Sequence, residues 1–205
     1  MSGAAAVAGL VLAGGQSRRM GGGDKFLLPL GGRRLIDRVA ARLAPQVGAL
    51  AISANCDPAL LSDTGLAVLA DAPPSRGPLS GLLAGMKWAA GALPGCTHVA
   101  TAAADTPFFP ADLVARLMEA GAGIGSATLA VSAGRVHPVF GLWPVAGRRY
   151  LEEFLAGSES WRMIDFAGRV GWREVDFPFP GDRDPFFNVN TPDDFAAAQR
   201  RMEQT

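Results

Sequence analysis

Short, almost wholly apolar runs alternate along the chain with segments in which apolar residues recur every three or four positions. The apolar runs have the length of buried strands, and the segments between them have the period of amphipathic helices. Strands and helices that alternate in this way are typical of βαβ units. The pattern therefore predicts an α/β protein with a mostly parallel central sheet.

The predicted elements follow one another in a regular order. Strands are predicted at Ala6–Leu12, Ala49–Ala54, Leu66–Ala70, His98–Ala104, Ala127–Val131 and Val136–Trp143. Helices are predicted at Leu35–Leu43, Leu79–Ala90, Pro110–Ala120, Ala146–Ala156 and Trp161–Ala167. A terminal helix is predicted after Thr191, because threonine is a good N-cap residue and Pro192 fits the first helical position. The same rule places Pro110 at the start of its helix.

Length and composition set the domain organisation. The chain has 205 residues, of which 49% are hydrophobic and 19% charged, as in an ordinary globular protein. We expect one domain, residues 1–205, built around a single core. The 19 Lys and Arg residues balance the 19 Asp and Glu residues. This zero formal net charge argues against a nucleic-acid partner.

Two further features bear on where the protein works. Cys56 and Cys96 lie far apart in the sequence, without the spacing of a zinc knuckle or a disulfide framework, which suits a reducing compartment. Residues 1–15 are apolar, but they lack a basic n-region and are too short to cross a bilayer. We therefore expect a cytoplasmic protein with no membrane partner.

The segment after the first strand carries the strongest chemical signal. Residues 12–25 read Leu-Ala-Gly-Gly-Gln-Ser-Arg-Arg-Met-Gly-Gly-Gly-Asp-Lys. The glycines let backbone N–H groups approach an anion, and Arg18, Arg19 and Lys25 can neutralise a polyphosphate. A Walker A loop needs Ser or Thr after its lysine, and the G-x-G-x-x-G dinucleotide spacing is also absent. The loop therefore predicts binding of a nucleoside triphosphate through another motif.

Polar residues also follow later strands, at Asn55, Asp71 and Asp105. Ligands of open α/β sheets bind at this edge, outside the carboxyl ends of the strands. The Asp105 carboxylate is suited to bind Mg²⁺. Alternatively, Asp105 is a helix N-cap before Pro107. Asp71 and Asn55 either hydrogen-bond to a base or ribose or are turn residues. A carboxylate such as that of Asp71 can accept hydrogen bonds from the adjacent N–H groups of guanine. The helix start after Gly77 either meets a phosphate or base carbonyl or is a plain helix start.

Taken together, these residues resemble the signature of the molybdenum cofactor guanylyltransferase family. The resemblance spans nearly the whole chain and continues through Asn55, Asp71, Gly77-Pro-Leu-Ser-Gly81, Asp105-Thr-Pro107, His137-Pro138 and Asn188-Val-Asn190-Thr-Pro192. The first motif alone indicates a broad group of nucleotidyltransferases, whereas the combination is specific. The resemblance implies a three-layer Rossmann-like nucleotidyltransferase fold with a mostly parallel central sheet. Where the family often has cysteine, this chain has Ala104, inside the strand, and we expect no change in chemistry.

The resemblance also implies a reaction: Mg²⁺-dependent transfer of GMP from GTP to Mo-molybdopterin, with release of pyrophosphate. Residues 1–110 would form the GTP-binding half and residues 111–205 the molybdopterin-binding half. The implied GTP-binding residues are Leu12, Ala13, Gly14, Gly15, Lys25, Asn55, Asp71, Gly77 and Asp105. Of the implied catalytic residues Arg19, Lys25 and Asp105, the last would also hold the metal. Molybdopterin would be bound by Asn188, Asn190, His137 and Arg162, with a structural role as the favoured alternative for His137.

Other functions remain open at this point. A molybdopterin cytidylyltransferase usually has Leu-Ala-Ala-Gly where this chain has Leu-Ala-Gly-Gly at residues 12–15, which favours GTP. Sugar-nucleotide pyrophosphorylases often carry a further C-terminal domain that this sequence does not show. A non-catalytic GTP-binding cofactor carrier would not need both Lys25 and Asp105. Because the cofactor is labile, we also expect transient contacts with molybdate-insertion or apoenzyme-chaperone proteins.

Overall fold

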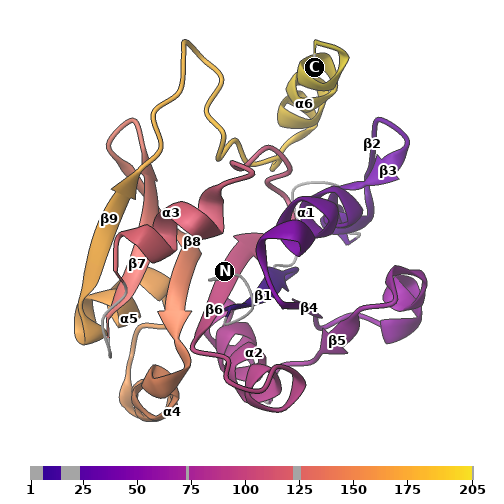
Figure 1. Ribbon diagram of the computed structural model, residues 1–205. Coiled ribbons are helices and arrows are strands. Elements are labelled where there is room, and N and C mark those ends of the chain that lie inside the picture. Colours follow the sequence, from indigo (N-terminus) through magenta and orange to yellow (C-terminus); the bar gives the residue numbers. More distant parts are fainter. Residues whose placement is uncertain (1–6, 15–23, 73, 122–125, 205) are drawn as a thin grey trace.

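A seven-stranded sheet forms the centre of the protein (Figure 1). The computed structural model describes residues 7–14, 24–72, 74–121 and 126–204. In spatial order the strands are β5 (Ala67–Leu69), β4 (Ala49–Ser53), β1 (Val7–Leu12), β6 (His98–Ala103), β8 (Arg135–Pro144), β7 (Ala127–Ser132) and β9 (Trp172–Asp176). β8 runs antiparallel to β6 and β7, and the other neighbouring strands are parallel. The prediction of a mostly parallel sheet is confirmed.

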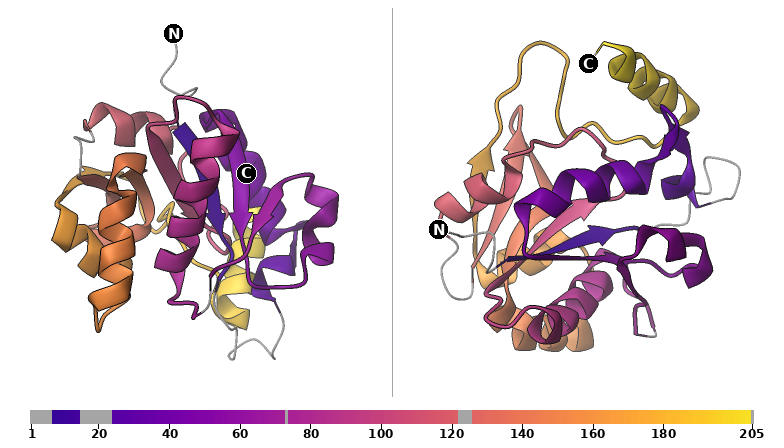
Figure 2. Two further views of the ribbon diagram at one scale, coloured as in Figure 1. Left: turned by 90° about the horizontal axis from the view of Figure 1, so that it is seen from below. Right: turned by 45° about the vertical axis from the view of Figure 1, so that its right-hand side comes forward.

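Helices cover both faces of this sheet and make three layers (Figures 1 and 2). α1 (Leu35–Leu43) and α3 (Leu113–Glu119) pack on one face, and α2 (Pro78–Ala92), α4 (Arg148–Gly157) and α5 (Met163–Val170) on the other. The alternation of side chains along β1 explains the two cores. Val7 and Val11 enter the core beneath α1 and α3, whereas Ala8, Leu10 and Leu12 enter the core beneath α2.

A third, smaller cluster holds the end of the chain. The short strands β2 (Pro29–Leu30) and β3 (Arg33–Arg34) form a separate antiparallel pair, and α6 (Pro192–Glu203) packs against β2. Leu30, Leu35, Val189 and Ala198 are buried together there. The C-terminal segment is therefore fixed beside the β2–β3 pair, far from it in the sequence.

The close approach of α2 to the sheet depends on two glycines. A Cβ atom on Gly85 would lie 2.5 Å from Leu10 Cδ2, and one on Gly81 would lie 2.4 Å from Ser53 Oγ. Both distances are shorter than any ordinary contact. Glycine at these positions therefore lets the amino end of α2 lie directly over the ends of β1 and β4.

Substituting alanine for Gly85 tests this packing against the fully buried Leu10. We expect the Gly85→Ala variant to be about 1–3 kcal/mol less stable than Gly91→Ala, because a core of this density does not accept an added methyl group. Gly91 is the matched control in the same helix, with nothing within 4 Å of an added Cβ. Urea denaturation measures both stabilities, and equal midpoints would contradict the packing argument.

Most predicted elements occur within a few residues of their expected bounds, with three differences. The helix predicted at Pro110–Ala120 begins at Leu113 instead, so Pro110 is not its first residue. The chain first turns out of the core at the fully buried Phe109, and the Pro110 carbonyl accepts the N–H of Leu113. β9 and the β2–β3 pair were not predicted. β9 is an edge strand that is mostly exposed or half-buried, so it lacks the apolar run of a central strand.

No helix in the described part of the chain is both long and apolar enough to span a membrane.

Candidate active site

The carboxyl ends of β1, β4, β5 and β6 meet at one edge of the sheet. Hydrogen bonds extend the parallel ladder one residue past β1, β4 and β6: Ala13 donates to Ser53, Ala54 to Leu69, and Ala104 to Leu12. The residues that follow these bonds leave the sheet side by side. They enclose a cavity of about 300 Å³, whose lining residues are Leu12, Gly14, Ser53, Ala54, Asn55, Asp71, Ser75, Gly77, Pro78, Ala103, Asp105, Val139 and Asn188.

A lysine, an aspartate and an asparagine from distant parts of the chain meet at this edge. Lys25 Nζ donates to Asp105 Oδ2 at 2.5 Å and to Asn190 Oδ1 at 2.7 Å. The side chains of Lys25 and Asp105 are 14% and 21% exposed. The pair is therefore partly shielded from water, and its charges interact more strongly than those of a surface pair.

The backbone explains why these three side chains meet. Lys25 opens a single turn of 3₁₀ helix whose next residue, Phe26, is buried in the core. The main-chain carbonyl of Asp105 accepts the N–H of the fully buried Val189 at 2.9 Å. The segment 188–190 is thereby attached to the end of β6, with Asn188 and Asn190 on either side of the attachment point.

The start of α6 fixes Asn190 from its other side. Asp194 Oδ2 accepts the backbone N–H groups of Asn190 and Thr191, and Thr191 Oγ1 accepts the N–H of Asp194. This reciprocal capping box confirms the predicted N-cap and places Pro192 at the first helical position. The cap therefore does more than start a helix, because it holds Asn190 toward Lys25.

A hydrogen-bonded group at the ends of β4 and β5 forms another wall. Asn55 Nδ2 donates to Asp71 Oδ2 at 2.8 Å, and Asn55 Oδ1 accepts the Asp71 N–H at 2.9 Å. Ser75 Oγ also donates to Asp71 Oδ2, at 2.6 Å. The Asp71 carboxylate is thus oriented by its neighbours while it lines the cavity.

The amino end of α2 provides a positive wall. Gly77 has φ +68° and ψ −150°, a conformation that side-chain-bearing residues rarely adopt, and α2 starts at Pro78. Ser80 Oγ accepts the Arg76 N–H at 2.9 Å, which satisfies one amide near the helix start. Gly77 and Pro78 line the cavity, so the positive end of the helix dipole faces any anion bound there.

Several residues implied by the resemblance lie elsewhere or are not described. Gly15 and Arg19 fall outside the described residues. Ala13 is buried behind the cavity wall. Arg162 is highly exposed, and its ion pair with Asp165 is 4.0 Å long. Its neighbour Trp161, 44% exposed, has the Arg76 guanidinium 4.9 Å from its ring centre, which brings the 161–162 segment near the start of α2.

His137 is held by the core rather than by the cavity. Its Nε2 lies 2.7 Å from Ser132 Oγ, which donates to Asp184, and its ring stacks on Phe186. Burial lowers the pKa of His137, and this outweighs the opposite effect of the Asp184 carboxylate. These contacts favour the structural role that the sequence left as its alternative.

Several lining residues could not be predicted from the sequence, among them Ser53, Ser75 and Val139. Ser53 is the last residue of β4. The sequence analysis considered polar residues that follow a strand, such as Asn55, and therefore did not select Ser53. Ser75 lies in an irregular segment with no pattern of its own. Val139 comes from the antiparallel strand β8, and its place beside β6 depends on sheet order.

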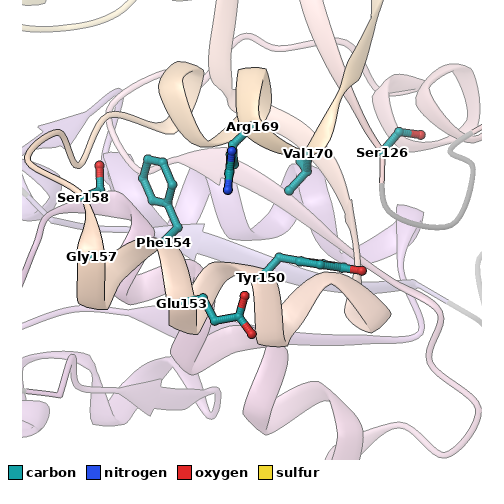
Figure 3. A pocket seen from close by; sticks show the side chains of 8 residues that line it. All are labelled: Ser126, Tyr150, Glu153, Phe154, Gly157, Ser158, Arg169 and Val170. Carbon is teal, nitrogen blue, oxygen red and sulfur yellow. The ribbon is translucent and has the colours of Figure 1, made fainter.

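A larger cavity, of about 790 Å³, lies between α4 and α5 (Figure 3). Tyr150, Glu153 and Phe154 line it from α4, and Arg169 lines it from α5. None of the residues predicted to bind nucleotide or molybdopterin lines it. Size alone favours the larger cavity, whereas the grouping of charged and polar side chains favours the sheet edge as the candidate site.

The oxygen atoms around Asp105 fit a hard divalent cation. Asp105 offers a carboxylate, and the amide oxygen of Asn190 points to the same lysine nitrogen. Within the described residues no group of three or more His, Cys, Asp or Glu residues is arranged to hold a metal. In proteins Mg²⁺ takes one or two carboxylates and completes its shell with waters and substrate phosphates.

The fold, and the cavity at the carboxyl ends of its parallel strands, are typical of an α/β nucleotidyltransferase. Residues 9–170 match the family described as the MobA-like NTP transferase domain. The chain belongs to this family.

Curated relatives and solved structures agree with this assignment. The chain is 51% identical over 201 residues to a molybdenum cofactor guanylyltransferase of Mesorhizobium japonicum, covering 96% of each chain. It is 52% identical over 196 residues to one of Cereibacter sphaeroides, covering 96% of this chain and 97% of the relative.

Two solved structures share the fold. The molybdopterin-guanine dinucleotide biosynthesis protein A of Archaeoglobus fulgidus has a TM-score of 0.73 and 23% identity over 97% of this chain and 100% of its own. A Mycobacterium tuberculosis protein solved in complex with manganese has a TM-score of 0.67 and 17% identity over 95% and 97%. At these identities the likeness concerns the fold.

Proposed function

We propose that the protein transfers GMP from GTP to the terminal phosphate of Mo-molybdopterin, forming the molybdopterin guanine dinucleotide cofactor and releasing pyrophosphate. The observation that carries the proposal is the meeting of Lys25, Asp105 and Asn190 beside the cavity that Asp71 lines. The names of relatives at about half identity over nearly the full length support the same reaction.

This transfer reaction requires neutralisation of negative charge rather than abstraction of a proton. A phosphate oxygen of molybdopterin is already an anion, and it attacks the α-phosphorus of GTP. A new P–O bond forms, the bond from the α-phosphorus to the bridging oxygen breaks, and pyrophosphate leaves with the electron pair. Lys25, together with Arg19, would stabilise the triphosphate, since preorganised cations placed where charge develops give the largest part of such catalysis.

We propose Mg²⁺ as the cofactor, held by Asp105. When bound, it would offset charge on the α-phosphate and the departing pyrophosphate. Lys25 donates to Asp105 Oδ2 in the structure, so the lysine would turn from the carboxylate to the phosphates when the nucleotide binds.

The walls of the cavity suit GTP. The amino end of α2 at Gly77 would meet phosphate or the guanine carbonyl, and Gly14 leaves the backbone open, with nothing within 4 Å of an added Cβ. Asp71, with Asn55, would bind the base. A carboxylate accepts the adjacent N–H groups of guanine and would face an acceptor atom in adenine or cytosine.

The two halves of the chain would share the substrates. We propose that residues 1–110 bind GTP and residues 111–205 bind molybdopterin, with Asn188 and Asn190 facing the pterin phosphate from the segment attached to Asp105. Arg162, exposed beside Trp161, would add positive charge on this side. Transient contacts with molybdate-insertion or apoenzyme-chaperone proteins and a cytoplasmic location stay predictions.

Calorimetric titration with GTP, CTP and ATP, each with and without Mg²⁺, tests the proposal. We expect GTP to bind preferentially and more tightly with Mg²⁺, since the metal neutralises the charge that Asp105 and the phosphates bring together. Chelation of Mg²⁺ should then abolish pyrophosphate release with molybdopterin. A preference for CTP would indicate a cytidylyltransferase, GTP binding without turnover would indicate a carrier, and no nucleotide binding would refute the proposal.

A further inference from the structure

The Asp71 carboxylate is held at one of its two oxygens. Oδ2 accepts two hydrogen bonds, from Asn55 Nδ2 at 2.8 Å and from Ser75 Oγ at 2.6 Å. Oδ1 is 3.5 Å from Ser53 Oγ, at the outer limit of a hydrogen bond. Each carboxylate oxygen accepts about two hydrogen bonds. Oδ2 is therefore filled, whereas Oδ1 keeps its capacity for a ligand.

The Asn55 amide is committed to the same residue at both ends. Its oxygen accepts the Asp71 N–H at 2.9 Å, and its nitrogen donates to Oδ2 and lies 3.4 Å from Ser75 Oγ. An amide whose strong bonds all go to Asp71 has little left with which to read a base. Asn55 therefore acts on the nucleotide through Asp71, together with Ser75.

We propose that Ser75 is a positioning residue for the choice of guanine. Its hydroxyl and the Asn55 amide fix the Asp71 carboxylate so that Oδ1 accepts N1–H and the 2-amino group of the guanine base. This inference rests on the proposed function. It adds a residue that the sequence did not single out and changes the role of Asn55 from a direct contact to an orienting one.

The orientation of the Asp71 carboxylate matters because other bases differ from guanine at N1 and at the 2-amino group. Adenine and cytosine present a ring nitrogen acceptor where guanine presents N1–H, so a fixed carboxylate repels them. Inosine keeps N1–H and lacks the 2-amino group, so it forms only one of the two hydrogen bonds. A carboxylate held by Asn55 alone would rotate more freely and bind guanine and hypoxanthine more nearly alike, since part of its preorganisation for the second donor is lost.

The experiment compares the binding of GTP and ITP to the full chain by calorimetry. The Ser75→Ala variant should weaken GTP binding about tenfold, as expected for a lost hydrogen bond to a charged group. ITP binding should change much less, so the GTP/ITP preference falls. Ser75 is exposed, so Ser75→Thr keeps the hydroxyl without crowding and should restore the preference. The matched control is Ser62→Ala, because Ser62 is exposed and its hydroxyl donates to the Ala59 carbonyl within the 3₁₀ helix Pro58–Thr64.

A second comparison separates positioning from other roles. In an Asp71→Ala background, Ser75→Ala should cause no further loss of GTP binding, because there is no carboxylate left to orient. A serine that touches the base itself would still matter in that background. A serine that only shapes the segment would weaken GTP, ITP and ATP equally. Either outcome would overturn the inference.

The same titrations keep the inference apart from the proposed function. If the wild-type protein shows no preference for GTP over ATP and CTP, the guanylyl-transfer proposal fails with it. If the wild-type protein prefers GTP and Ser75→Ala keeps the full GTP/ITP preference, the positioning role alone is wrong.

Discussion

The Asp105→Ala variant is expected to transfer GMP at a rate lower by about 3–4 kcal/mol in activation free energy, on the order of a hundredfold or more. Asp105 supplies the carboxylate in the group of Lys25, Asp105 and Asn190 at the edge of the sheet, and its Oδ2 lies 2.5 Å from Lys25 Nζ. Without it the cation at the triphosphate would lose its protein ligand. A pyrophosphate-release assay at increasing Mg²⁺ measures the effect, and the residual activity should need more Mg²⁺ for half-saturation.

The substitution leaves the backbone free to keep its structure. The bond from the Val189 N–H goes to the main-chain carbonyl of Asp105, which alanine retains. Asp63→Ala is the matched control, since Asp63 is exposed and pairs with Arg34 at the surface, where ion pairs contribute little. If Asp105→Ala turns over at a near-normal rate with unchanged Mg²⁺ dependence, Asp105 has no part in the mechanism.

The Lys25→Ala variant is expected to lose a similar factor, about a hundredfold or more, for a different reason. Lys25 is the positively charged residue of this group and donates hydrogen bonds to both Asp105 and Asn190. Its removal leaves the charge that develops on the triphosphate without a counter-charge, so GTP turnover should fall while the Mg²⁺ concentration for half-saturation changes little. Comparing the two variants at several Mg²⁺ concentrations separates the lysine from the metal ligand.

The chain offers a direct control for this substitution. Lys87 is the other lysine of the sequence, and it is exposed on α2 in an ion pair with Glu152. Lys87→Ala should turn over within about twofold of the wild type, because exposed ion pairs are worth little. Equal losses in the two variants would show that overall charge, and not the position of Lys25, supports the activity.

Local signals were enough to predict much of the fold. The apolar runs of β1 and β6 have the length and burial of central parallel strands, and α6 begins with the capping box that Thr191 and its neighbours indicate. These features depend on residues within a few positions of one another. β9 was missed because an edge strand with exposed and half-buried residues, such as Arg173 and Glu174, does not show the apolar run of a buried strand.

The start of α3 was mispredicted for a related reason. Proline is favoured at a first helical position, and this local rule selected Pro110. In the structure the preceding Phe109 is buried against Phe140 of β8, so the chain must turn before a helix can begin at Leu113. The contact between Phe109 and Phe140, which are far apart in the sequence, thus overrides the preference of proline for a first helical position.

The sequence by itself determined several of the chemical groups of the candidate site. Asn55, Asp71 and Asp105 follow apolar strands, and parallel strands bring their carboxyl ends to one edge, so the sequence placed these groups together. Lys25, at the end of the glycine-rich loop, was predicted to serve the same edge. These inferences needed the order of residues along the chain and the geometry of a parallel sheet.

The tertiary structure alone decided which side chains hold one another. Asn190 reaches Lys25 across 165 positions because Val189 bonds to the backbone of Asp105 and the α6 cap fixes the turn. Ser75 reaches Asp71 from an irregular segment that has no periodic pattern. The physical reason is that periodicity reports which face of an element is buried, whereas the orientation of a polar side chain depends on hydrogen-bond partners that folding brings from elsewhere in the chain.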